Sequence, residues 1–302
     1  MMKGWFYKTL IAGSGKYGEW FFKLFAWFVS TGYFVLCPHR VRTGINFYKA
    51  LFPNRRIPYH IRCTWKQFHN FTDVFLERAM IAGTSGNATF TSTGLEHLER
   101  AIKNRTGGVM IMSHAGSWDA AAHHLMRELP ELSLLLYMGE KQKEQIESFQ
   151  KNDLQDAGIK VIAIDKEGGS PFDIVEGVKQ LRDGGMVSMT GDVLWHRDQR
   201  SVRVAFLGYE AKLPETPYLL ALLSNVPLYV FFAWRMGKRH YHVSISGPIE
   251  IASEIETGVS RAHRRKAIDE TAQKYADHLA RNILEHPFQW YHFEPFLGKK
   301  IH

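Results

Sequence analysis

The stretch "VMIMSHAGSWDAAAHHL", residues 109 to 125, joins an apolar run of strand length to a pattern typical of a helix. The apolar run ends at Ser113 and His114. Ser117 then stands where helix caps are found, and Asp119 falls in the first helical turn. A strand that leads through a short loop into a helix is the repeating unit of folds with parallel sheets. This stretch therefore predicts an α/β fold.

The same alternation of extended and helical patterns continues through most of the chain. Apolar runs of strand length occupy residues 132–138, 159–165, 185–192 and 227–234. Helical patterns occupy residues 65–83, 94–104, 140–152, 171–184, 216–224 and 260–287. We predict one α/β domain over residues 57–302, with a mostly parallel sheet flanked by helices. An N-terminal helical segment that associates with membranes is expected over residues 1–56.

The charge of the chain favours acidic partners. The 302 residues carry a formal net charge of +8, and no acidic residue lies between Glu19 and Asp73. Such a balance suits anionic lipid, an acidic carrier protein or nucleic acid. The two cysteines, Cys37 and Cys63, provide no disulfide framework, which indicates a reducing, cytoplasmic setting.

An aromatic-rich segment, "WFFKLFAWFVSTGYFVLCP", occupies residues 20–38. Its uncharged run, residues 24–38, is shorter than the roughly 20 residues that span a bilayer. Aromatic side chains with flanking lysine and arginine favour a helix that lies in the membrane interface, and a buried helix of a soluble core is the alternative. Upstream, "GSGKYG" at residues 13–18 has dinucleotide-site spacing but no acid about 20 residues later, so we interpret it as a turn.

Reactive side chains in α/β folds lie beyond the carboxyl ends of the strands. His114 stands there, and Asp119 is near enough for its carboxylate to meet the ring N–H of His114. A carboxylate on one imidazole nitrogen leaves the other nitrogen free to accept a proton. The same spacing also suits a packed histidine and an aspartate favoured by the helix dipole alone, so both interpretations stay open.

"SHAGSWDAA", residues 113–121, resembles the H-x-x-x-x-D/E motif of the lysophospholipid acyltransferase superfamily. The wider pattern is most similar to the bacterial lipid A biosynthesis acyltransferases of the lauroyl/myristoyl type. The segments that carry this similarity are "HRVRTGINFYKALFP" (39–53), "GGMVSMTGD" (184–192), "RSVRVAFLG" (200–208), a helix opened by Thr216, and "HPFQWYHFEPF" (286–296).

The resemblance implies a membrane-associated acyltransferase in which His114, with Asp119, deprotonates an acceptor hydroxyl or amine. The donor would be acyl-carrier protein or acyl-CoA, the acceptor a lipid or glycolipid, and no cofactor or metal is expected. The expected location is the cytoplasmic face of the bacterial inner membrane, against its anionic surface. The segment "HFEPFL" (292–297) departs from the His-x-Arg-Trp of lipid A enzymes, so the acceptor need not be a lipid A precursor.

Further substrate-binding residues follow from that chemistry. The N–H groups of Gly116 and Ser117 are candidates for stabilising the oxyanion that forms when a thioester is attacked. Asp192, Arg200 and Arg203 follow the strand "MVSMT" at 186–190, and an arginine there suits a phosphate, although a solvated loop is the alternative. Alternation along the strand would turn Arg200 and Arg203 to opposite faces, so at most one of them can aim at the same phosphate. We favour Arg200 because it lies nearer the loop at residues 191–196, which should border His114. Thr216 completes the predicted set.

Two other classes of function stay open. A metal-dependent hydrolase would draw on the histidines and acids at positions 114, 119, 123, 124, 192 and 196, although no specific metal motif is present. A nucleic-acid-binding module would explain the basic, aromatic N-terminal third. It leaves the order of the motifs unexplained, so we expect no nucleic acid partner.

Overall fold

The computed structural model describes residues 19–83, 88–139, 154–164, 171–195, 198–251 and 260–301. The glycine pattern at 13–18 and the helix expected at 140–152 lie outside the described residues. So do His196 and Arg197 of the loop that follows Asp192.

Most helices and strands follow one another in the predicted order. The helices are α2 (Glu19–Leu36), α3 (Pro38–Leu51), α4 (Ile57–Gly83), α5 (Leu95–Asn104), α6 (Trp118–Glu128), α8 (Pro171–Arg182), α9 (Thr216–Ser224) and α10 (Arg261–Glu285). The strands are β1 (Thr89–Thr93), β2 (Gly108–Met112), β3 (Leu134–Gly139), β4 (Lys160–Ile164), β5 (Met186–Thr190), β6 (Ser201–Phe206), β7 (Tyr209–Pro214), β8 (Leu228–Gly237), β9 (His240–Ile245) and β10 (Leu297–Lys300).

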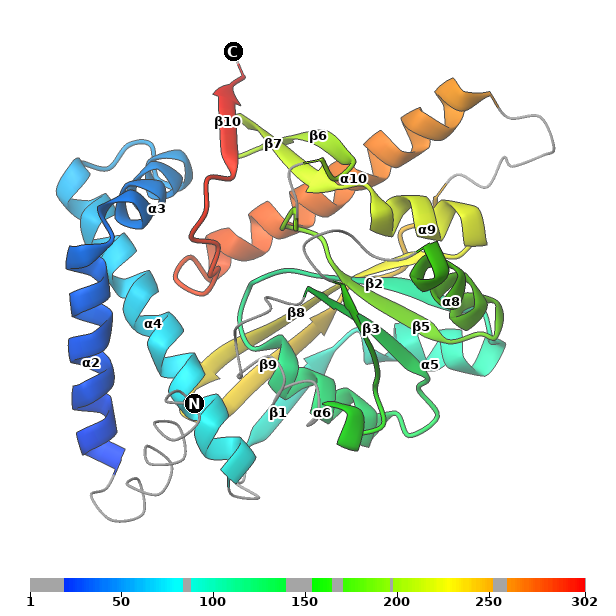
Figure 1. Ribbon diagram of the computed structural model, residues 1–302, viewed down its shortest axis with the longest axis horizontal. Helices are drawn as coiled ribbons and strands as arrows, with labels where there is room; N and C mark the ends of the chain where they lie inside the picture. The colour runs from blue at the N-terminus through cyan, green and yellow to red at the C-terminus, as the bar shows by residue number, and fades with distance from the viewer. Residues whose placement is uncertain are drawn as a thin grey trace.

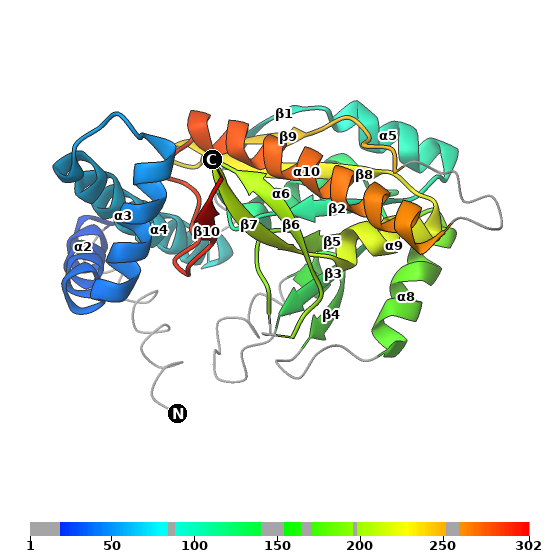
Figure 2. The same ribbon diagram turned by 90° about the horizontal axis from the view of Figure 1, so that it is seen from above.

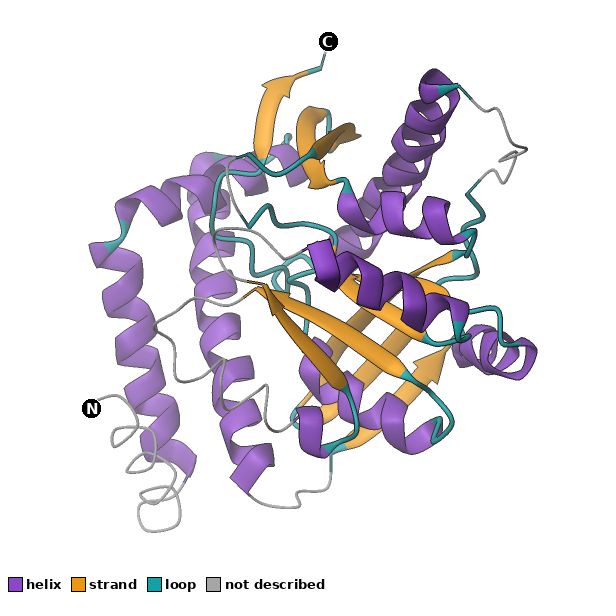
Figure 3. Cartoon of the chain, turned by 45° about the vertical axis from the view of Figure 1, so that its right-hand side comes forward, coloured by secondary structure: helices purple, strands orange, loops and turns teal. Residues whose placement is uncertain are grey.

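The central sheet has seven strands in the order β1-β9-β8-β2-β5-β3-β4. All neighbouring strands run parallel except β8 and β9, which form an antiparallel pair. Helices cover both faces of this sheet (Figures 1 and 3). The predicted α/β fold with a mostly parallel sheet is therefore confirmed.

Strand β2 shows why the apolar runs of this sheet are continuous. All five of its residues are buried. Val109 and Ile111 belong to the hydrophobic core that includes α9 and α10, whereas Met110 and Met112 belong to the core that includes α5 and α6. Successive side chains of a strand point to opposite faces, so a strand covered on both sides needs apolar residues at every position. Figure 2 shows the helices on the two sides of the sheet.

A smaller antiparallel sheet, β10-β7-β6, packs beside α10. Along β6 the buried side chains are those of Val202, Val204 and Phe206, and Arg203 between them is exposed. The predicted alternation is therefore confirmed. The polar strand β7 and the short strand β10 were not predicted, because neither has a distinct apolar pattern.

Helices α2, α3 and α4 pack on one another beside the α/β layers (Figures 1 and 2). Their outer side carries many exposed apolar residues, among them Trp20, Phe28 and Val35. In the described part of the chain, no helix combines the length and apolar character that crossing a bilayer requires. Helix α4, which follows the predicted domain boundary between residues 56 and 57, packs on α2 and α3, which precede it. That boundary therefore stays a prediction.

The C-terminal segment, residues 286–297, joins these helices to the rest of the protein. Tyr48 donates a hydrogen bond to the carbonyl of Pro287 at 2.8 Å, and Asn70 donates to the carbonyl of Phe288 at 3.3 Å. The ring of Phe47 lies against that of Trp290, with centroids 4.9 Å apart. The C-terminal segment therefore lies between the N-terminal helices and the carboxyl ends of the strands.

Candidate active site

The carboxyl ends of β2 and β5 bring together two residues that are 78 positions apart in the chain. These strands are parallel neighbours, and Met112 pairs with Thr190. Extending that register by two residues places His114 beside Asp192. The side chains meet, with Nδ1 of His114 2.9 Å from Oδ1 of Asp192, and the backbone N–H of His114 donates to Oδ2 at 2.8 Å.

Asp192 is buried and ionised. Burial by itself raises the pKa of this carboxyl group, but the charge and hydrogen bond of His114 oppose it, with further contributions from His292 and Trp290, and hold the pKa below its usual value. An ionised carboxylate only accepts hydrogen bonds, so Nδ1 of His114 carries a proton and Nε2 is left as the basic nitrogen. The His114 side chain is 34% exposed, whereas that of Asp192 is fully buried. The imidazole is thus the member of the pair that a substrate can reach.

The C-terminal segment completes the surroundings of this pair. The indole N–H of Trp290 donates to Oδ2 of Asp192 at 2.8 Å, and Nε2 of His292 lies 3.1 Å from the Asp192 carbonyl oxygen. The backbone N–H of Tyr291 donates to the carbonyl of His114 at 2.7 Å. Three consecutive residues therefore hold the backbone or the carboxylate of the pair in place.

Two buried tyrosines lie beneath Asp192. Burial, and then the negative charge of Asp192, raise the pKa of Tyr218 on α9 and of Tyr275 on α10 well above the usual value. Both phenols are therefore protonated at neutral pH. The Tyr275 hydroxyl donates to the carbonyl of Met112 at 3.2 Å, which supports the end of β2.

The structure bonds Nδ1 of His114 to Asp192, an acid that was not predicted as its partner. The predicted contact of Asp119 with the ring stays a prediction. Asp119 lies buried in the first turn of α6, as predicted from the sequence. Its part in the chemistry stays a prediction, as does the part of His114 itself.

The loop between β2 and α6 carries two other predicted site residues, Gly116 and Ser117. The N–H of Gly116 donates to the carbonyl of Gln289 at 2.7 Å, and that of Ser117 donates to the carbonyl of Ala233 at 2.8 Å. Both groups already donate to backbone carbonyls, and their binding of an oxyanion stays a prediction. Ser117 occupies the N-cap position of α6, but its side chain makes no capping hydrogen bond.

A glycine is required at position 116. Its φ of +68° belongs to the left-handed region, and a Cβ there would collide with the carbonyl oxygen of Ala233. This close approach lets the loop pair with β8 on one side, while Ala115 pairs with Trp290 on the other. The backbone on both sides of Gly116 is thereby fixed.

The arginines that follow Asp192 have separate places. Arg203 points outward from β6, is 72% exposed and lies 3.7 Å from Glu210 in a surface ion pair. Arg200 is exposed and immediately precedes β6, and its carbonyl accepts the N–H of Glu215 at the start of α9. Thr216 is the first residue of α9, as predicted. Substrate binding by Arg200, Arg203 and Thr216 stays a prediction.

Trp290, His292, Tyr218 and Tyr275 were not among the predicted site residues. For Trp290 and His292 a signal existed, because both lie in the C-terminal motif at residues 286–296 that carries the family resemblance. In the described ranges, no three histidine, cysteine, aspartate or glutamate side chains gather as metal ligands would. Zinc analysis of the purified protein tests the metal-dependent alternative.

Comparison with known proteins bears on the same residues. A sequence profile described as bacterial lipid A biosynthesis acyltransferase matches residues 45–297. Phosphatidylinositol mannoside acyltransferase of Mycobacterium tuberculosis (strain ATCC 25618 / H37Rv) is 23% identical over 205 residues, which are 67% of this chain and 58% of the relative. The protein of the same name from Mycolicibacterium smegmatis is 22% identical over 206 residues, 67% of this chain and 60% of the relative.

The chain thus covers less than two thirds of the length of these relatives. The family profile, in contrast, extends over most of the chain and includes the strand ends that carry His114 and Asp192, as well as Trp290 of the C-terminal segment. This chain belongs to the bacterial lipid A biosynthesis acyltransferase family.

Proposed function

We propose that this protein is an acyltransferase that moves a fatty acyl chain from an acyl thioester to a hydroxyl or amine of a lipid or glycolipid. The observation that carries the proposal is the contact of the partly exposed His114 imidazole with the buried, ionised Asp192. Family membership and the names of the relatives support the reaction class and a lipid acceptor.

The chemistry follows from the positions of the protons. Nε2 of His114 removes the proton of the acceptor as its oxygen or nitrogen attacks the thioester carbonyl, and Asp192 stabilises the imidazolium that forms. When the tetrahedral intermediate collapses, the carbon–sulfur bond breaks and the imidazolium returns the proton to the leaving thiolate. Hydrogen-bond donors at the strand ends would stabilise the oxyanion of this intermediate.

The donor is acyl-carrier protein or acyl-CoA, both of which are negatively charged and suit the net charge of +8. The donor is a substrate, and the mechanism requires no further cofactor. We place the protein at the cytoplasmic face of the bacterial inner membrane, where both thioesters and lipid acceptors are accessible. The basic residues between Lys23 and Lys66 would contact anionic lipid there.

The exposed apolar side of α2 is the proposed membrane contact. Phe28 and Val35 on this helix are 60% and 69% exposed. Replacing both with glutamate is expected to lower partitioning onto phosphatidylglycerol vesicles by about tenfold or more, because two apolar side chains no longer leave water and two like charges face the lipid. Leu223→Glu, on α9 and 53% exposed, is the matched control. Co-sedimentation measures the bound fraction, and wild-type binding by the double variant would move the contact away from α2.

Trp290 provides a second measurable effect. Trp290→Phe keeps an aromatic ring against Phe47 but removes the N–H that donates to Asp192. A hydrogen bond to a charged group contributes about 1.5–3 kcal/mol, so we expect kcat to fall by about 10- to 100-fold with KM little changed. Trp234→Phe is the matched control, since Trp234 is also 1% exposed but does not bond to Asp192. Equal losses in the two variants would show that only packing is involved.

The reaction itself is tested with purified protein and radiolabelled palmitoyl-carrier protein or palmitoyl-CoA, using a total lipid extract as acceptor. Label should move into a lipid fraction with one of the donors. Mass spectrometry of lipids from cells with and without the protein should then identify one species that loses a single acyl chain. Label that appears only as free fatty acid would instead indicate a thioesterase and would overturn the proposal.

A further inference from the structure

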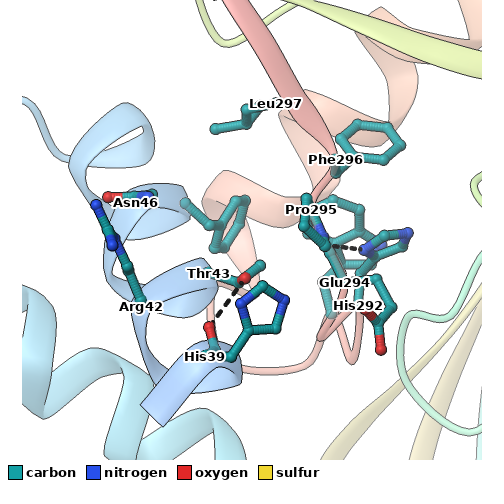
Figure 4. A pocket seen from close by; sticks show the side chains of 11 residues that line it. His39, Arg42, Thr43, Asn46, His292, Glu294, Pro295, Phe296 and Leu297 are labelled. Carbon is teal, nitrogen blue, oxygen red and sulfur yellow. Dashed lines mark hydrogen bonds between the residues drawn. The ribbon is translucent and has the colours of Figure 1, made fainter.

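A cavity of about 260 Å³ lies between α3 and the C-terminal segment (Figure 4). One wall belongs to α3 and carries His39, Arg42, Thr43 and Asn46. These residues are three or four positions apart and therefore share one face of the helix. The wall is polar and holds one permanent positive charge.

The opposite wall belongs to the segment that holds the proposed catalytic pair. Trp290 and His292 both line the cavity, and both contact Asp192, through the carboxylate and through the backbone carbonyl respectively. A ligand in this cavity therefore lies beside Trp290 and His292, which both hydrogen-bond to Asp192.

The charges around the cavity favour an anion. Arg42 is exposed and forms no ion pair with a carboxylate of the residues that the structure describes. Glu294, the one acidic residue in the lining, is 3.3 Å from Arg40 in an ion pair of its own. His39 also lies in the first turn of α3, where the helix dipole is positive.

The size and the aromatic part of the lining restrict the ligand further. Pockets that enclose a whole small molecule measure about 300–1,000 Å³, so a cavity of about 260 Å³ suits a headgroup better than an acyl chain. Apolar surface beside the polar wall is provided by Phe47, Trp290 and Phe296. It suits the carbon skeleton that adjoins the charged group of such a ligand.

We propose that this cavity binds the phosphate-bearing part of a substrate and that Arg42 is the bidentate partner of the phosphate. The inference rests on the proposed acyl transfer, because it takes the cavity to be the place where a substrate is held beside His114. The phosphate belongs either to the pantetheine arm of the donor or to the headgroup of the acceptor lipid. Arg200 and Arg203, in contrast, lie outside the lining of this cavity.

Equilibrium binding to the full chain tests the cavity in a His114→Ala background, where no turnover consumes the ligands. The donor probes are palmitoyl-CoA and palmitoyl-pantetheine, which lacks phosphate. The lipid probes are phosphatidylglycerol and diacylglycerol in neutral detergent micelles. Arg42→Gln and Arg42→Lys are compared with Arg264→Gln, which removes an exposed arginine from α10 outside the cavity.

Arg42→Gln is expected to weaken binding of one phosphate-bearing probe by about 10- to 100-fold, and Arg42→Lys by about three- to tenfold, because lysine keeps the charge but not the bidentate geometry. Binding of the phosphate-free probes, and binding of every probe by Arg264→Gln, should change by less than about twofold. A loss confined to palmitoyl-CoA assigns the phosphate to the donor, and one confined to phosphatidylglycerol assigns it to the acceptor.

Three outcomes would overturn the proposal. If Arg42→Gln binds every probe as Arg264→Gln does, the cavity holds no phosphate, while the proposed function is unaffected. If phosphate-free probes lose affinity equally, Arg42 acts on the fold rather than on the phosphate, and thermal unfolding would reveal this. If the parent protein binds no probe at all, the cavity proposal fails, and the assay with radiolabelled donors decides separately whether acyl transfer takes place.

Discussion

His114→Ala is expected to lower the rate of acyl transfer by about 10³-fold or more, with the fold intact. The imidazole is, among the described residues, the basic group that both contacts an ionised, buried carboxylate and is itself partly exposed at the strand ends. Its loss removes the proton acceptor and the proton donor of the two steps. Because 34% of this side chain is exposed, little packing is lost.

Steady-state transfer from palmitoyl-carrier protein measures the rate, and circular dichroism monitors thermal unfolding of the same samples. His263→Ala is the matched control, because His263 lies exposed at the start of α10, away from the strand ends. A folded His114→Ala protein with near wild-type turnover would show that another group removes the proton.

Asp192→Asn is expected to lower kcat by a factor on the order of 10³–10⁴. Oδ2 of Asp192 accepts from two N–H groups, those of the His114 backbone and the Trp290 indole. In the variant, the amide oxygen of the new side chain would keep those two bonds, which turns its NH₂ group towards Nδ1 of His114. Nδ1 must then accept, the ring proton moves to Nε2, and the nitrogen that should take the substrate proton is no longer basic.

Asp198→Asn is the matched control, since it removes one exposed charge from the same loop. Asp119→Asn should lower the rate rather than change KM if Asp119 also stabilises the imidazolium, but by less than Asp192→Asn, because Asp192 is the carboxylate bonded to Nδ1. A larger loss from Asp119→Asn than from Asp192→Asn would restore Asp119 as the principal partner of His114.

The sequence predicted the elements well because their signals are local. The helix predicted over residues 216–224 is α9, and the strand at 185–192 contains β5. The spacing of apolar residues along the chain agrees with the observed burial wherever a segment packs on a single core or is covered on both faces. Position 114 at a strand end followed from the same local pattern, since a polar Ser-His pair ends an apolar run.

The pairing within the site depends on contacts between distant segments. Asp119, five residues from His114, was the obvious partner along the chain, whereas Asp192 becomes the partner through the parallel register of β2 and β5. The N–H groups of Gly116 and Ser117 were predicted to bind an anion without regard to the backbone that packs on this loop. In the fold, these N–H groups donate hydrogen bonds to the carbonyl groups of residues 289 and 233.

The amino-acid sequence by itself thus determined the α/β class, the order of most elements and the position of His114. Hydrophobic periodicity and the residues that end helices and strands are signals that extend over only a few residues. Tertiary structure alone decided which acid orients that histidine, that Trp290 and His292 support the acid, and that Arg42 faces them across a cavity. The physical reason is that strand order and register bring together residues separated by 78 positions or more, and such neighbours leave no periodic signal along the chain.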